Sequence, residues 1–228
     1  MKVTALIPVK SFRNAKQRLS PLLDVAEREK LAELMFREVL AQLLRARGLA
    51  AIAVVTGDDA VARIASSFNA IVIRESQENG ETAAVDFARY DLKQCGCEAI
   101  LIVPGDMPLL RPSDVESLLA EIPEEADAPY ALLVPSHDRL GTNALLLAPP
   151  DVIKLRFGYD SFSFHMNQLA AQGLPMRFVE NERIALDIDD PKDLHKFLSY
   201  EHEDNDVKRA VKEMLANSDG KRRHSGGL

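Results

Sequence analysis

The first segment with residue types suited to chemistry is a basic loop near the start of the chain. It follows the apolar run VTALIP and carries four cations, namely Lys10, Arg13, Lys16 and Arg18. The whole chain is acidic, with a formal net charge of -7, so a local excess of positive charge indicates a local cause. Lysine and arginine bind phosphate oxygens through charge-assisted hydrogen bonds. The loop predicts a polyanionic ligand, although Lys10 and Lys16 could also be ordinary surface charges.

Two acidic turns supply the opposite charge. Asp106 follows the most apolar run of the chain, in AILIVPGD, and Asp187 and Asp189 lie in LDIDDP. Carboxylate oxygens are ligands that Mg²⁺ prefers, and bound Mg²⁺ bridges phosphate oxygens. The aspartates and the basic loop together predict a magnesium-nucleotide site. Two other interpretations stay open. Asp106 could cap a turn, and Asp187 or Asp189 could pair with Lys192 or cap the helix that begins at Pro191.

Several common catalytic patterns do not occur in the sequence. It has no GxxxxGK(S/T) phosphate loop, and no GxGxxG motif follows the first apolar run. No Ser-His-Asp or Cys-His arrangement can be argued from His137 or His165, so a covalent intermediate is not indicated. Cys95 and Cys97 are too close for an ordinary structural disulfide loop, and no second cysteine pair completes a zinc site.

The elements that must position these side chains alternate between strand and helix in the first half of the chain. Apolar runs predict strands at residues 3–8, 51–56, 70–73 and 99–106. A long helix is expected from Asp24, as N-cap, to a stop at Gly48, and shorter helices at residues 57–68 and 82–93. Continuous apolar runs joined by helices indicate a mostly parallel sheet covered on both faces, that is, a three-layer α/β/α fold.

The second half is less regular. Strands are predicted at residues 130–135 and 143–150 and in the runs MRFVE and RIALDID, and a helix at about residues 160–172. Pro191 opens a further helix, PKDLHKFL. We expect residues 1–200 to form one domain. Residues 201–228 are expected to be a polar extension with a short helix and a disordered tail.

This architecture predicts where the charged segments meet. Ligands of parallel α/β sheets bind at the carboxyl ends of the strands. The basic loop, the turn beginning at Thr56, the PGDMP turn and the LDIDD segment all follow predicted strands. If the RIALDID strand continues, Asp187 and Asp189 have the same side-chain parity and face one site. We therefore expect the four segments to converge and to hold a triphosphate between ammonium groups and a carboxylate-bound ion.

Five motifs, in this order, resemble those of a known family. They are IPVKSFRNAKQRLS, VPGDMPLL, LGTNALLL, FGYDSFSFHMNQLAAQG and LDIDDPKDL. Together they are similar to the guanylyltransferases of deazaflavin coenzyme (F-420) biosynthesis. That family lies within the MobA-like nucleotidyltransferases, which include molybdopterin guanylyltransferase. The resemblance covers about residues 2–200, and it implies the nucleotide-diphospho-sugar transferase fold, also called GT-A-like.

The resemblance implies an activity. A member of this family transfers GMP from GTP to a small phosphorylated acid, with Mg²⁺ as cofactor and pyrophosphate as the second product. The acid is 2-phospho-L-lactate, phosphoenolpyruvate or 3-phospho-D-glycerate, and the residues of this chain do not decide among them. GTP and one such acid are therefore the expected partners.

The resemblance also implies roles for individual residues. The expected nucleotide-binding residues are Lys10, Lys16, Arg18, Thr56 and Thr82. The expected catalytic residues are Lys10, Lys16 and Asp106, and the expected metal ligands are Asp106, Asp187 and Asp189. The phosphate or carboxylate of the acid is expected at Thr142, Gly158 and Ser161. Independently, Ser161 precedes a predicted helix, whose first amides suit an anion.

Two segments depart from the family pattern. Glu81 and Thr82 stand where relatives tend to have a Leu-Asn pair, which leaves the contacts to the guanine base open. The loop before Gly141 is often glycine-rich in relatives, but it contains Arg139 here. That arginine could reach the carboxylate of the acid or point into water.

The composition of the chain excludes some of the remaining classes of function and location. The negative charge argues against general nucleic-acid binding, no apolar run approaches the ~20 residues that cross a bilayer, and no signal peptide opens the sequence. We expect a cytoplasmic protein, with a homodimer left open. One alternative is a nucleotidyltransferase for a molybdopterin or sugar phosphate, which the missing AGGxGxRM loop disfavours. The other is a non-catalytic nucleotide-binding module, which the retained lysines and carboxylates disfavour.

Overall fold

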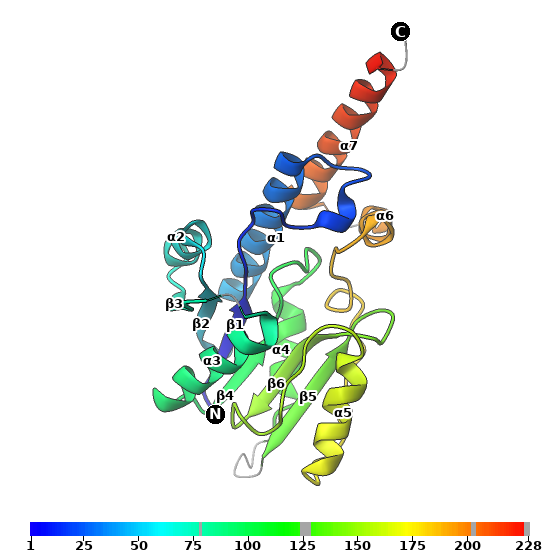
Figure 1. The fold of residues 1–228 in the computed structure, drawn as a ribbon. Helices are drawn as coiled ribbons and strands as arrows, with labels where there is room; N and C mark the ends of the chain where they lie inside the picture. Colours follow the sequence, from blue (N-terminus) through cyan, green and yellow to red (C-terminus); the bar gives the residue numbers. More distant parts are fainter. Residues whose placement is uncertain (78, 124–128, 202–203, 226–228) are drawn as a thin grey trace.

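The computed structural model describes residues 1–77, 79–123, 129–201 and 204–225, with side chains described as far as residue 217 (Figure 1). Its centre is a six-stranded sheet in the order β3-β2-β1-β4-β6-β5. The strands β1, β2, β3 and β4 all run parallel to one another, whereas β6 is antiparallel to both β4 and β5. The strands are β1 (Val3–Pro8), β2 (Leu49–Thr56), β3 (Ile71–Arg74), β4 (Ala99–Ile102), β5 (Tyr130–Pro135) and β6 (Thr142–Ala148). The predicted mostly parallel sheet is confirmed.

Helices connect the strands. The longest described helix is α1, and a capping box forms its N-terminus. In this box the side chain of Asp24 accepts from the amide of Glu27, and the side chain of Glu27 accepts from the amide of Asp24. The helix ends at Arg45, before the predicted stop at Gly48. The helices are α1 (Val25–Arg45), α2 (Asp59–Ser67), α3 (Glu81–Gln94), α4 (Pro112–Ala120), α5 (Ser161–Ala171), α6 (Pro191–Ser199) and α7 (Asp206–Ser225).

Each face of the sheet carries its own apolar core. Side chains alternate across a strand. Accordingly, Ala5 and Ile7 of β1 pack with α1, α2 and α4, whereas Leu6 packs with α3 and α5 on the opposite face. Figure 1 shows helices on both sides of the sheet. The predicted three-layer α/β/α architecture is confirmed.

A third apolar cluster, the third core, joins the segments that follow the strands to the end of the chain. Its buried residues are Leu19, Leu23, Leu31, Met35, Leu109, Leu186, Ile188, Leu194, Phe197, Val207, Val211 and Met214. They come from the basic loop, α1, the turn after β4, the segment before α6, and α6 and α7. The third core therefore links α7 to the segments on which the predicted chemistry depends.

The predicted strand RIALDID is wrong. Residues 182–185 form a turn instead, with the amide of Ala185 donating to the carbonyl of Asn181 (2.8 Å). The side chain of Asn181 accepts from the amides of Arg183 (3.0 Å) and Ile184 (3.1 Å), which stabilises the turn locally. Later amides of this segment bond to other loops, since Ile188 donates to the carbonyl of Asp106 (3.2 Å). The segment therefore bonds to its own turn and to another loop rather than to a neighbouring strand.

Two other segments differ from expectation. MRFVE makes only an isolated parallel bridge, between Phe178 and Leu133 of β5, so it is not a full strand. The helix predicted after Tyr200 exists but is longer than expected, because α7 reaches Ser225. Its Val207, Val211 and Met214 are buried in the third core. The end of the predicted tail, residues 226–228, lies outside the described residues.

Candidate active site

The basic loop lies between β1 and α1, and its backbone fixes the position of Lys16. The amide of Val9 donates to the carbonyl of Val55 (3.0 Å), so the loop starts beside the end of β2. Lys16 has a left-handed backbone conformation, with φ of 51°, which is uncommon outside glycine. A short 3-10 helix, Gln17–Leu19, follows, and Leu19 is anchored in the third core. The side chain of Lys16 is consequently held inward and is only 10% exposed.

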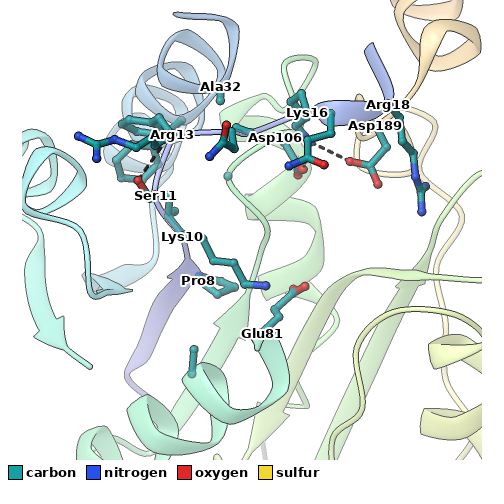
Figure 2. Close-up of a pocket in the computed structure, with 18 of the residues that line it drawn as sticks. Pro8, Lys10, Ser11, Arg13, Lys16, Arg18, Ala32, Glu81, Asp106 and Asp189 are labelled. Atoms are coloured by element: carbon teal, nitrogen blue, oxygen red, sulfur yellow. Dashed lines mark hydrogen bonds and ion pairs between the residues drawn. The ribbon is translucent and has the colours of Figure 1, made fainter. Parts of the chain in front are cut away.

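The ammonium group of Lys16 lies between two carboxylates from distant segments. Its Nζ donates to Oδ2 of Asp106 (2.5 Å) and to Oδ1 of Asp189 (2.8 Å), as Figure 2 shows for Asp189. Burial by itself would lower the pKa of Lys16, but the charges and hydrogen bonds of the two aspartates outweigh it and raise this pKa. Lys16 is therefore charged, and the expected convergence of the basic and acidic segments is present.

Three aspartates form an acidic triad around this ammonium group. Asp106, Asp187 and Asp189 each offer one oxygen, and these oxygens lie within 4.8 Å of one another. The hydrogen bond from the amide of Ile188 to the carbonyl of Asp106 joins the two segments that carry them. The side-chain amide of Asn143 donates to Oδ1 of Asp187 (2.9 Å) and orients it. Two loops far apart in the sequence are thus held in one cluster.

The carboxylates of the triad are in unequal environments. Burial, followed by the charge of Asp106, raises the pKa of Asp187 to about 6, and the hydrogen bond from Asn143 only partly opposes this. Burial also acts to raise the pKa of Asp189, but the charge and hydrogen bond of Lys16 lower it overall. One cation therefore compensates the charge of the triad incompletely.

The triad has the donor set of a magnesium site. Its ligands are oxygens, as Mg²⁺ requires. Oδ1 of Asp106 is buried and has no hydrogen-bond partner among the described residues. A buried carboxylate oxygen without a partner is costly, and a cation would satisfy it. Asp106, Asp187 and Asp189 could therefore hold Mg²⁺.

A pocket of about 720 Å³ adjoins the triad. It is large enough for a nucleotide, since small-molecule pockets span roughly 300–1,000 Å³. All three expected phosphate-binding cations, Lys10, Lys16 and Arg18, line it, and so do Asp106 and Asp189. Figure 2 shows Lys10 on one side of this pocket and the pair of Lys16 and Asp189 on the other. The pocket thus has cationic groups along its length and the aspartates Asp106 and Asp189 at one end.

Glu81, the first residue of α3, also lines the pocket. Figure 2 shows its carboxylate and the ammonium group of Lys10 directed toward each other. Burial, followed by the charge of Asp106, raises the pKa of Glu81 to about 7, while the charge of Lys10 acts in the opposite direction. Glu81 is thus the pocket carboxylate that is most easily protonated near neutral pH among those with a resolved shift.

Thr56 and Thr82 lie outside the lining of the pocket, and their hydroxyl oxygens accept backbone hydrogen bonds. Oγ1 of Thr56, which is fully buried, accepts from the amide of Asp58 (3.0 Å). Oγ1 of Thr82 accepts from the amide of Phe157 (2.9 Å) and so joins α3 to the loop before α5. Both contacts shape segments near the pocket, and their role in nucleotide binding stays a prediction.

The residues predicted to bind the acid lie together. The amide of Thr142 donates to Oγ of Ser161 (3.0 Å), and the amide of Ser161 donates to the carbonyl of Gly158 (3.2 Å). Gly158 has φ of +97°, a conformation that favours glycine. Thr142 and Ser161 are buried and do not line the pocket. Substrate binding by these residues stays a prediction.

His165 holds this cluster together in its neutral form. Its ring is buried; Nε2 accepts from the amide of Arg156 (3.2 Å), and Nδ1 lies 2.9 Å from Oγ1 of Thr142. Because Nε2 accepts, Nδ1 carries the proton and donates to Thr142. Burial, followed by the charges of Arg156 and Arg89, lowers the pKa of His165 to about 4. The histidine has a structural role here.

This pKa predicts a pH dependence of stability. The folded pKa of His165 lies below its ordinary value of 6.5, so only the unfolded chain takes up this proton between pH 6.5 and 4. The free energy of unfolding should therefore fall as the pH decreases through this window, by about 3 kcal/mol in total. Urea denaturation of the unchanged chain and of His165→Gln at pH 7, 5.5 and 4.5 measures it. The variant should lose less stability on acidification, and equal losses would contradict the assignment.

Asn143 is a site residue that the sequence analysis missed. Besides its contact with Asp187, its Nδ2 donates to the carbonyl of Ile184 (3.0 Å). A signal did exist, because an amide side chain starts the otherwise apolar run NALLLA, and a buried polar group needs partners. The identity of those partners required the fold, since the turn of residues 182–185 was predicted as a strand.

The fold defines a class of protein, that of the nucleotide-diphospho-sugar transferase type. A crystal structure from Desulfovibrio desulfuricans G20, named as such a transferase, has a TM-score of 0.77 at 17% identity, covering 96% of this chain and 98% of that one. A cytidylyltransferase from Leptospira borgpetersenii has a TM-score of 0.59 at 15% identity, covering 98% and 96%. These similarities confirm the predicted fold.

Within this class, the chain belongs to the CofC-like guanylyl transferase family, whose family model matches residues 3–221. A phosphoenolpyruvate guanylyltransferase from Conexibacter woesei is 34% identical, covering 100% of this chain and 95% of that protein. One from Rubrobacter xylanophilus is 39% identical, covering 85% and 92%. A 2-phospho-L-lactate guanylyltransferase from Methanothermobacter thermautotrophicus is 32% identical, covering 87% and 85%. The family resemblance seen in the motifs is confirmed, and the chain is an enzyme of the nucleotidyltransferase type.

One further property concerns membranes. Among the described residues, none of the helices combines the length and the apolar character that a transmembrane span requires.

Proposed function

We propose that this chain transfers GMP from GTP to a small phosphorylated carboxylic acid, with release of pyrophosphate, in coenzyme F-420 biosynthesis. The observation that carries the proposal is the contact of Lys16 with Asp106 and Asp189 at the end of a pocket of about 720 Å³. The pocket offers cations for a triphosphate beside a carboxylate site for its metal ion. Membership of the guanylyl transferase family supports GTP as the nucleotide.

The proposed reaction is a direct displacement at phosphorus. A phosphate oxygen of the acid bonds to the α-phosphorus of GTP, and the bond from that phosphorus to the bridging oxygen of pyrophosphate breaks. Pyrophosphate leaves with the bonding electrons. The attacking phosphate is already ionised, so no general base is needed. Positioning and neutralisation of charge then supply most of the rate.

The proposed roles follow the chemistry of each side chain. Mg²⁺, held by the acidic triad, would neutralise the phosphates when bound. Lys10, Lys16 and Arg18 bind phosphate oxygens and stabilise charge on the leaving pyrophosphate. Thr56 and Thr82 support the nucleotide subsite through the segments they fix. The acid is bound next to Thr142, Gly158 and Ser161, at the N-terminus of α5, whose helix dipole favours an anion.

Phosphoenolpyruvate is the acceptor that we expect first. It is the acid in the names of the relatives from Conexibacter woesei and Rubrobacter xylanophilus, at 34% and 39% identity. The relative named for 2-phospho-L-lactate is 32% identical. The expectations of a cytoplasmic protein and of a homodimer stay predictions.

A substrate panel tests the proposal. The protein is incubated with GTP or ATP, with and without Mg²⁺, and with phosphoenolpyruvate, 2-phospho-L-lactate or 3-phospho-D-glycerate. Mass spectrometry should detect a guanylylated acid, and a coupled assay an equal amount of pyrophosphate, only when GTP and Mg²⁺ are both present. Binding of GTP by calorimetry without any product from the three acids would instead support a non-catalytic nucleotide-binding module. A sugar phosphate is tested in the same way, and product from it but from none of the three acids would support a different transferase.

A further inference from the structure

The segments that carry the charged site are also joined on their apolar side. Leu186 and Ile188 alternate with Asp187 and Asp189, and both apolar side chains are fully buried in the third core. The same core contains Leu109, from the turn that begins at Asp106. The acidic triad is therefore the polar side of two segments whose apolar side packs together.

Helix α7 completes this core. Val207, Val211 and Met214 are its buried contributions. Figure 1 shows α7 beside α1, with its far end extending beyond the rest of the molecule. The buried Lys208 donates from Nζ to the carbonyl of Tyr200, at the end of α6, which fixes the start of α7 against that helix. The near end of α7 is therefore rigidly attached to the site segments.

One side chain connects α7 directly to the turn that carries Asp106. Nδ2 of Asn205, the residue before α7, donates to the carbonyl of Pro108 (2.7 Å). Oδ1 of the same side chain accepts from the amide of Lys208 (2.9 Å) and caps the helix. Both ends of this amide are thus used, one for the helix and one for the turn. The contact with Pro108 spans 97 positions of the sequence.

We propose that Asn205 is a positioning residue for the acidic triad, acting on Asp106 through the carbonyl of Pro108. The role in catalysis rests on the proposed function, whereas the role in positioning does not. A metal site needs its ligands held at fixed distances, and groups behind the ligands supply this constraint. The C-terminal helix, outside the sheet and its two cores, is by this inference part of the active-site support.

The two roles of Asn205 can be separated by substitution. Asn205→Asp keeps an oxygen that caps α7 and removes the Nδ2 donor to Pro108. Asn205→Ser also keeps a capping oxygen and is too short to span the distance to that carbonyl. The aspartate adds a negative charge, which by itself would favour a cation, so weaker metal binding cannot result from charge. Ile64→Val, in the core on the α1 face of the sheet, is the matched control for a general loss of stability.

Hydrogen exchange measures the position of the turn without reference to activity. The reporters are the amide of Leu110, which bonds to the carbonyl of Met107, and that of Ile188, which bonds to Asp106. Both amides should exchange about fivefold faster in Asn205→Asp and Asn205→Ser, as expected for loss of one ordinary hydrogen bond. Ile64→Val should leave them unchanged. Exchange equal to that of the unchanged protein in both variants overturns the proposal.

Metal binding measures the consequence for the triad. Mn²⁺, which is detected by electron paramagnetic resonance, is titrated into the protein in the presence of GTP. The dissociation constant should rise on the order of tenfold in both variants, and pyrophosphate release at limiting Mg²⁺ should fall with it. Faster exchange with unaltered Mn²⁺ affinity would overturn the proposal, and so would failure of the unchanged protein to bind Mn²⁺. If exchange and Mn²⁺ affinity change but the unchanged protein forms no guanylylated product, the proposed function fails and the positioning role stands.

Discussion

Asparagine in place of Asp106 is expected to lower the rate of pyrophosphate release by on the order of a thousandfold. The two side chains have the same shape, so the fold should survive. The substitution removes one anionic ligand of the acidic triad and the closer of the two carboxylates that contact Lys16, at 2.5 Å. It also removes the negative charge of the carboxylate whose Oδ1 is buried without a hydrogen-bond partner in the described part of the chain, so this group attracts a cation less strongly. Rate and thermal unfolding of Asp106→Asn are measured at saturating GTP, acid and Mg²⁺.

The matched control for this prediction is Asp151→Asn. Asp151 also pairs with a lysine, Lys93, at 2.5 Å, but both side chains are more than 40% exposed and lie away from the pocket. Exposed pairs contribute about 0–1 kcal/mol, so this variant should keep its rate and its melting temperature. Near-normal pyrophosphate release from a folded Asp106→Asn protein would remove Asp106 from the metal site.

Methionine in place of Lys16 is expected to lower the rate by a hundredfold or more, on the order of the effect of other groups that stabilise transition-state charge. The variant keeps the length of the side chain and removes its charge. The stability should also fall, because Asp106 and Asp189 lose the cation between them. We expect a decrease of about 2 kcal/mol, less than for a fully buried pair, since these carboxylates are 25% and 49% exposed.

Magnesium ions provide a second measurement on Lys16→Met. A divalent cation can replace the missing ammonium group, so Mg²⁺ should raise the melting temperature of the variant more than that of the unchanged protein. Lys93→Met, which breaks the exposed pair with Asp151, should show neither the loss of rate nor this response. A normal rate with a normal KM for GTP in Lys16→Met would contradict the proposed contact of Lys16 with phosphate.

The alternating part of the fold could be predicted from the sequence. Strands such as Val3–Pro8 and Leu49–Thr56 are buried on both faces, so they are continuous apolar runs, and the helices between them have clear caps such as Asp24. RIALDID has the same apolar composition, but the side chain of Asn181 turns its backbone. Hydrogen bonds donated by the first amides of the run to the side chain of a residue before it stabilise the turn, and no periodicity within the run reports them.

The meeting of the site segments could be predicted, but their contacts could not. Carboxyl ends of parallel strands share one edge, which was enough to expect Lys16, after β1, near Asp106, after β4. Asp189 was expected there as the end of the strand RIALDID, which does not form, so its place near Lys16 agrees with the prediction although the predicted strand was wrong. The contacts of Lys16 with these residues span 90 and 173 positions, and no local pattern encodes them. Asn143 and Asn205 act through carbonyls and carboxylates of other loops, so their roles became visible only with the three-dimensional structure.

The ion pairs of Lys16 have a consequence for the order in which ligands arrive. A bare metal ion that enters the triad must compete with an ammonium group already in contact with two of its three carboxylates. A metal ion bound to a nucleotide would bring phosphate oxygens, which would give the ammonium group of Lys16 a new anionic partner. If the proposed function holds, we therefore expect the resting enzyme to discriminate against free divalent ions and to take up the metal together with its nucleotide, as a single chelate.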